Sequence, residues 1–414
     1  MSLLFVASAC AGGLYFGLAQ RRFDFLAVGF LSAVVYFLPG FLGITLYPLG
    51  GSHLAPLELS EGTYLAMALV LLTILATALA FDALVPPDRR PAVHLLKAEW
   101  LPEVATVLAA AGFGWTVLSS GSSLLDSNKA VMMASLGPGF TLWEVGAEVG
   151  LISSFVLRRR WCLAICGLLL IGTLVIGFRY PLVLGLIACG TIWLNRMPPM
   201  RFLVRCWALV PLLALGGTFF CVYKQVQWNL KAGYLERVYE ALIDPDTYLM
   251  SIVKSEPFIT QTILNEVLER DYRLDPTYLL GNAFQLLPGT QMFGGTVVSF
   301  NDQFQPALFP HVEYGLAGNL WAEGYAIGGW AGVVGFALLI SIGLGGSSFW
   351  MRSKDCTLLV LASLMAVVIA FYVHRNEVAM LITLEKRAAL LVFAAYVMAL
   401  GAAVSGRVKE ATAG

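Results

Sequence analysis

Long apolar runs, each about the length needed to cross a lipid bilayer, recur along this chain and limit what it can fold into. A spanning helix needs about 20 predominantly apolar residues. Only 13% of the 414 residues are charged, against about 25% in a soluble domain. We therefore predict an all-α polytopic membrane protein with about 11 transmembrane helices. The predicted spans are residues 2–20, 25–47, 63–86, 101–120, 139–157, 161–178, 180–195, 202–223, 329–349, 356–373 and 388–405.

Basic residues gather in alternate loops between these runs, and this pattern predicts an orientation. Cytoplasmic loops carry an excess of Lys and Arg. With the N-terminus outside and the C-terminus inside, six basic clusters fall on the cytoplasmic side. The first cluster follows the run 2–20 instead of preceding it, so we expect a spanning helix there and not a signal peptide. The clusters contain Arg21 and Arg22, Arg89, Arg90 and Lys97, Arg158 to Arg160, Arg196 and Arg201, Arg352 and Lys354, and Arg407 and Lys409.

One long hydrophilic segment, residues 224–313, then falls outside the membrane. We divide the chain into transmembrane helices 1–8 (1–223), this large periplasmic loop (224–313) and re-entrant or transmembrane helices 9–11 (314–414). Long loops in a compact protein are usually functional. Apolar residues at helical spacing predict that the loop is partly helical. They are Leu235, Val238, Tyr239 and Leu242 in one set, and Ile259, Ile263, Val267 and Leu268 in another.

Several classes of function have no support in this sequence. The seven cysteines include no CxxC pair and have no His beside a pair, so we expect neither disulfides nor a metal site. Walker A, GxSxG and HExxH patterns are missing, so ATP-driven and metalloprotease chemistry are not indicated. The net charge is zero, and no nucleic-acid partner is indicated. We expect no cofactor.

Arg179 stands between two apolar runs, in IGFRYPLVLG, with almost no loop around it. An arginine at such a boundary is costly unless it reaches the membrane surface or finds an anionic partner. It either marks the end of a helical hairpin or presents its guanidinium to a phosphate, which arginine binds through two hydrogen bonds.

The last outer loop is also basic, on the side where few basic residues are expected. It contains His374, Arg375, Lys386 and Arg387. These residues either bind an anion together with Arg179 or pair with Glu377 and Glu385 of the same loop.

The segment 309–336 combines carboxylates with many glycines, which permit close helix packing or a broken helix. Glu323 lies in an apolar run, either as a buried carboxylate paired with an arginine or as part of a site. His311 and Glu313 precede the return to the membrane. They are either surface residues or a base that removes a proton from a hydroxyl group.

Three patterns give the chain a resemblance to the Wzy-type oligosaccharide repeat-unit polymerases, which are relatives of the O-antigen ligases. Arg179 is followed by ten residues and Gly190, as in an arginine motif of one external loop of these polymerases. The stretch YLLGNAFQLLPG (278–289) is similar to a segment of their large loop. AEGYAIGGWAG (322–332) matches their E-x-Y-x-x-x-G signature at Glu323, Tyr325 and Gly329. Their second arginine motif has no match, because neither Arg375 nor Arg387 has the required spacing.

The resemblance implies a glycosyltransferase of the bacterial inner membrane, with its active site facing the periplasm. It would polymerise polyprenyl-diphosphate-linked oligosaccharides and release polyprenyl diphosphate. Such a lipid-linked oligosaccharide would serve both as the donor and as the acceptor. Membrane lipid and a chain-length regulator protein are the other expected partners. We expect Glu313, His311 and Arg179 to be catalytic. The alternatives are an O-antigen-type ligase and a transporter or flippase of lipid-linked glycans. The residues expected to bind substrate are Arg375, Arg387, His374, Tyr180, Glu323 and Tyr325.

Overall fold

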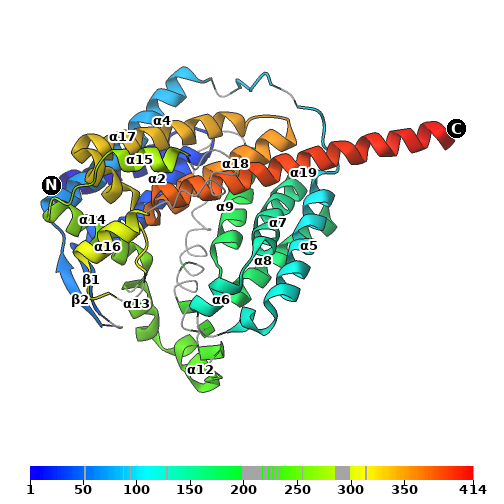
Figure 1. Ribbon diagram of the computed structural model, residues 1–414. Coiled ribbons are helices and arrows are strands. Elements are labelled where there is room, and N and C mark those ends of the chain that lie inside the picture. The colour runs from blue at the N-terminus through cyan, green and yellow to red at the C-terminus, as the bar shows by residue number, and fades with distance from the viewer. Residues whose placement is uncertain are drawn as a thin grey trace.

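The computed structural model is built almost entirely from helices, many of them apolar (Figure 1). It describes residues 1–50, 53–86, 88–93, 95–126, 129–197, 217, 222–223, 226–227, 229–231, 233–253, 255–284, 299–312 and 315–413. Six helical segments in this part of the chain are long and apolar enough to cross a membrane, so the protein is a helical membrane protein. They are Glu61–Leu84, Leu101–Leu124, Pro138–Leu157, Leu320–Trp350, Cys356–Arg375 and Val378–Val404.

Four further apolar helices are shorter than these. They are α1 (Ser2–Leu18), α2 (Phe25–Tyr36), α8 (Arg160–Ile176) and α9 (Tyr180–Asn195). Each coincides with one of the predicted spans to within a residue or covers the first part of it. The predicted span 202–223 lies almost wholly outside the described residues, so the total of about 11 stays a prediction.

The membrane helices form two groups joined by α18 (Cys356–Phe371). In the first group, α17 (Leu320–Trp350) packs along α4 (Glu61–Leu84), and α4 contacts α1 and α2. In the second, α7 (Pro138–Leu157) packs against α5 (Leu101–Ser120), α8 and α9. Helix α18 contacts α2, α7, α9 and α17. The long last helix, α19 (Val378–Ala413), runs beside α18 and reaches over α5 and α7 (Figure 1).

Helices α5 and α7 approach each other closely because small residues face one another between them. A Cβ atom on Gly112 of α5 would lie 2.4 Å from the backbone nitrogen of Trp143 in α7. This tight packing fixes α7, whose side chains Trp143, Glu144 and Glu148 are all buried.

The predicted span 25–47 is not one helix. Helix α2 ends at Tyr36, the short α3 (Leu38–Leu42) follows, and β1 (Ile44–Gly50) pairs with β2 (His53–Glu58) in an antiparallel hairpin. Apolar content alone does not separate a strand from a helix. Tertiary contacts decide it here, since the Thr262 hydroxyl donates to the Leu46 carbonyl at 2.7 Å and holds β1 against α14 (Glu256–Glu269).

The range 224–313 contains helices, including the two that the apolar spacing predicted, α12 (Leu235–Ile243) and α14. Asp244 directly follows α12, and its carboxylate accepts hydrogen bonds from the backbone of Asp246 and Thr247 at the start of α13 (Pro245–Val253). Its role there is that of a helix cap. The same range also contains α15 (Thr277–Phe284) and α16 (Phe300–Leu308). Outside it, the remaining short elements are η1 (Gly121–Leu125), α6 (Lys129–Ser135) and η3 (Tyr372–Arg375).

Candidate functional site

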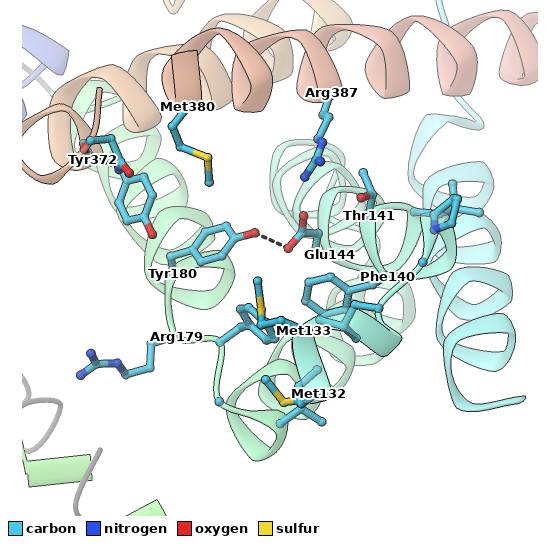
Figure 2. Close-up of a pocket in the computed structure, with 18 of the residues that line it drawn as sticks. Met132, Met133, Phe140, Thr141, Glu144, Arg179, Tyr180, Tyr372, Met380 and Arg387 are labelled. Carbon is cyan, nitrogen blue, oxygen red and sulfur yellow. Dashed lines mark hydrogen bonds between the residues drawn. The ribbon is translucent and has the colours of Figure 1, made fainter. Parts of the chain in front are cut away.

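A pocket of about 1220 Å³ lies between the second helix group and α19, and its walls come from segments far apart in the sequence. Its walls include the start of α7, the α8–α9 turn, the start of α14, η3 and one face of α19. Figure 2 shows residues of α7, α9, η3 and α19 around the pocket. Predicted outer loops from four parts of the chain therefore meet at one place. Of the residues expected to act on substrate, Arg179, Tyr180, Arg375 and Arg387 line this pocket.

Arg179 and Arg375 form ion pairs with the same carboxylate, that of Glu256. Arg179 Nη2 lies 3.2 Å from Glu256 Oε1, and Arg375 Nη1 lies 2.5 Å from Oε2. Glu256 opens α14 directly after Ser255 and before a proline, a typical helix start, and an acidic residue is favourable in this first turn. The three side chains are about one-third exposed or less, so the guanidinium groups remain within reach of a ligand in the pocket.

Lys231 adds a further cation to the pocket wall. Its ammonium donates to the backbone carbonyls of Asp126 and Ile176, each at 3.4 Å. Burial lowers the pKa of Lys231, and the nearby Asp126 carboxylate opposes this effect. An anionic ligand beside Lys231 would also raise the pKa of the ammonium group, and the ammonium charge would in turn hold the ligand.

A second polar group lies deeper along the helices. Glu144 of α7 is only 2% exposed and accepts a hydrogen bond from the hydroxyl group of Tyr180, the first residue of α9. Arg387 of α19 points toward Glu144 from the opposite wall (Figure 2). Tyr180 directly follows Arg179, so the outer arginine pair and this inner group are connected through neighbouring residues.

The rest of the pocket wall is largely apolar. Methionine side chains are prominent in it, and they adapt to irregular apolar ligands. A pocket with arginines at one end and an apolar wall beside them suits an anionic group attached to an apolar chain. The apolar wall includes Met132, Met133, Leu136, Phe140, Met380, Leu390, Leu391, Ala394 and Met398.

His374, expected to bind substrate, does not line this pocket. Its side chain is 1% exposed and accepts a hydrogen bond from Trp321 Nε1 at 3.1 Å. The imidazole ring stacks on Tyr36, with 5.2 Å between ring centroids, and meets Phe37 edge-on. His374 therefore joins η3 to α2 and α17 in the core.

Glu323 lies outside the pocket as well and helps to fix the ends of helices. It is fully buried, and its Oε2 accepts a hydrogen bond at 2.8 Å from the backbone N–H of Val378, the first residue of α19. A carboxylate at a helix N-terminus is favourable. Glu377, which we considered as a partner for the basic residues nearby, instead accepts from the backbone N–H of Asn301 in α16. Burial raises the pKa of Glu377.

Tyr325 and Gly329 form part of a contact between the large loop and a broken helix. Helix α17 kinks at Gly329, whose φ is +59°. Arg273 donates to the Tyr325 carbonyl at 2.9 Å, and the backbone N–H of Leu274 donates to the Ala326 carbonyl at 2.8 Å. The kink leaves these two carbonyls without their usual backbone N–H donors from the next helical turn, and Arg273 and Leu274 supply hydrogen bonds in their place.

Of the two residues expected to supply the base, the structure describes only His311, which does not line the pocket. His311 is exposed, and its Nε2 lies 2.6 Å from the Pro48 carbonyl oxygen of β1. Glu313 lies outside the described residues. Lys386 and Arg387 are not in a loop, because α19 already begins at Val378.

Four charged residues of the pocket were missed by sequence reasoning, namely Asp126, Glu144, Lys231 and Glu256. A signal existed for Glu144, since a carboxylate in an apolar run usually has a function. No such signal marked Glu256 or Lys231, which are ordinary charged residues of a hydrophilic segment. Within the described ranges, no group of three or more His, Cys, Asp or Glu side chains is placed to hold a metal ion.

Comparison with protein-family models, with curated proteins and with solved structures gives no match. The resemblance to oligosaccharide polymerases rests on the sequence patterns alone.

Proposed function

We propose that this protein is a membrane glycosyltransferase that polymerises polyprenyl-diphosphate-linked oligosaccharide repeat units. In this proposal it lies in a bacterial inner membrane with about 11 spans, N-terminus outside and C-terminus inside. The pocket faces the periplasm. The observation that carries the proposal is the meeting of Arg179, Arg375 and Arg387 in one pocket with an apolar wall.

The chemistry that such a pocket suits is transfer away from a lipid diphosphate. Guanidinium groups bind phosphate oxygens through paired hydrogen bonds, so Arg179 and Arg375 would hold the diphosphate of the donor. They would also stabilise the charge that builds up as polyprenyl diphosphate departs. The apolar wall formed by α6 and α19 would hold the first part of the lipid. The substrates are already activated, so the reaction needs no nucleotide.

The test is a reaction of the purified protein in lipid nanodiscs with a lipid-diphosphate oligosaccharide, resolved on a gel. A polymerase gives a ladder of products. A ligase leaves the donor unpolymerised until a second lipid or protein acceptor is added, and a transporter gives no new glycosidic bond in either case. Those two results would each overturn the polymerase proposal.

The matched variants are Arg179→Ala and Arg270→Ala. Arg270 pairs with Glu266 on α14 at 2.8 Å and does not line the pocket. Removal of one group that stabilises the developing charge typically costs about 10²–10³ in rate. We expect that loss for Arg179→Ala at an unchanged protein level, and little change for Arg270→Ala. Full activity of Arg179→Ala would show that the diphosphate is held elsewhere.

A further inference from the structure

The carboxylates that line the pocket differ in what they contact. In the described part of the chain they are Asp126, Glu144 and Glu256. Glu256 is held between two arginines, and the charge of Asp126 acts on Lys231. A carboxylate bound to cations is a weak proton acceptor, because the cations stabilise its ionised form. The hydrogen bond that Glu144 accepts comes instead from a neutral hydroxyl group, that of Tyr180. The charge of Arg387 also acts on Glu144 from across the pocket, but among the described residues the two form no ion pair of the kind that holds Glu256.

The position of Glu144 is fixed from two sides. Its backbone belongs to α7, which packs tightly against α5, and Tyr180 orients the carboxylate through Oε2. Because Tyr180 bonds to Oε2, Oε1 is the oxygen that we assign to the proton of the acceptor, and Arg387 points toward the carboxylate from the opposite wall (Figure 2). A base needs this kind of fixed position within hydrogen-bonding reach of the proton that it removes.

We propose that Glu144 is the base of the glycosyl transfer, with Tyr180 as its positioning residue. This inference rests on the proposed function and adds to it the residue that activates the acceptor sugar. Because Tyr180 follows Arg179 directly, the group that orients the base and a group that holds the leaving diphosphate lie on neighbouring residues. The distance between base and leaving group then depends on the packing of α7, which carries Glu144, against α9, which begins at Tyr180.

The step balances without any other reactant. The acceptor hydroxyl oxygen forms a bond to the anomeric carbon of the donor while its proton passes to Glu144 Oε1. The bond between the anomeric carbon and the phosphate oxygen breaks, and its electron pair leaves with polyprenyl diphosphate, beside Arg179 and Arg375. The products are a glycan longer by one repeat unit, polyprenyl diphosphate and protonated Glu144, which then loses its proton to water.

The experiment compares Glu144→Gln with Glu148→Gln. Glu148 lies one turn further along α7, is also buried, and does not line the pocket. It is therefore a matched control for the loss of a buried charge. A positioned base typically contributes about 10²–10⁴ in rate. We expect Glu144→Gln to lower kcat by that amount with the KM for the donor unchanged, and Glu148→Gln to keep the wild-type rate.

Two further variants separate chemistry from folding. In Glu144→Ala, added formate should restore part of the lost rate, because a small carboxylate then takes the place of the missing one. Tyr180→Phe should lower kcat less than Glu144→Gln does, since it removes the orienting hydrogen bond but keeps the carboxylate. Size-exclusion profiles and melting temperatures of all variants report whether each one folds.

The outcomes separate this inference from the proposed function. Wild-type rates in Glu144→Gln, or equal losses in Glu144→Gln and Glu148→Gln without formate rescue, overturn the role of Glu144 and leave the glycosyltransferase proposal standing. A wild-type protein that forms no glycosidic bond, although it binds polyprenyl diphosphate, overturns both.

Discussion

Arg179 and Arg375, which come from opposite halves of the chain, bind the two oxygens of one carboxylate, that of Glu256. The arrangement matches the way in which two arginines would hold a phosphate group. The sequence alone provides the two arginines, but the partner between them is a residue of the large loop. Glu256 therefore occupies the position that we assign to an anionic substrate.

Replacement of Glu256 by Gln should strengthen the binding of inorganic pyrophosphate. The substitution removes the negative charge that competes with the ligand for both guanidinium groups. Because these side chains are partly exposed, we expect a gain of up to about tenfold in affinity, which corresponds to about 1.4 kcal/mol. Isothermal titration calorimetry in detergent measures it. Glu266→Gln, on the same helix but outside the pocket, is the control. Weaker binding in Glu256→Gln would mean that the carboxylate holds the arginines in place for the ligand.

Replacement of Gly329 by Ala should destabilise the protein by about 1–3 kcal/mol, because residues other than glycine rarely adopt a positive φ. The new Cβ atom would also lie 2.9 Å from Arg273 Nη1, which bonds to the Tyr325 carbonyl. Gly328→Ala is the matched control, because its Cβ atom would meet open space. Thermal unfolding in detergent compares the two. Equal melting temperatures would contradict the role of the kink.

Asp271→Asn should remove a pH-dependent contribution to stability. Hydrogen bonds from Tyr325 and Arg273 lower the pKa of Asp271. A lowered pKa means that the stabilisation is fully present above the ordinary value of about 3.9 and is lost as the pH falls through the folded-state value. Melting temperatures of wild type and variant should therefore differ near neutral pH and converge in acid. A difference that stays constant down to about pH 3 would show that the charge of Asp271 does not matter.

His311→Ala should leave the transfer rate within about twofold of wild type, because any group outside the pocket is too far from the proton to be removed. The variant loses one contact to the Pro48 carbonyl, and an average hydrogen bond contributes about 0.5–1.5 kcal/mol. Initial rates at saturating donor and a melting curve measure both effects. A large loss of kcat in a stable variant would return His311 to the role of base.

The sequence was sufficient to predict the membrane class and several individual helices. Apolar length is a local property, so the runs at 63–86, 101–120 and 139–157 predicted helices that the structure contains. The spacing of Leu235, Val238 and Leu242 likewise predicted α12. The hairpin at β1 could not be predicted in this way, because its residues are as apolar as those of a helix and its conformation depends on contacts with α14.

The candidate site was likewise predicted from the sequence only in part. The sequence by itself marked Arg179, Arg375 and Arg387, because a charge beside an apolar run is costly and needs a reason. Only the tertiary structure decided that these three share a pocket while His374 and Glu323 are buried in the packing of η3, α17 and α19. It also brought Glu256 between two arginines and Tyr180 to Glu144. The physical reason is that the free-energy cost of a charged side chain in a membrane depends on that residue and its local sequence. The groups that such a side chain contacts depend on how segments far apart in the chain fold together.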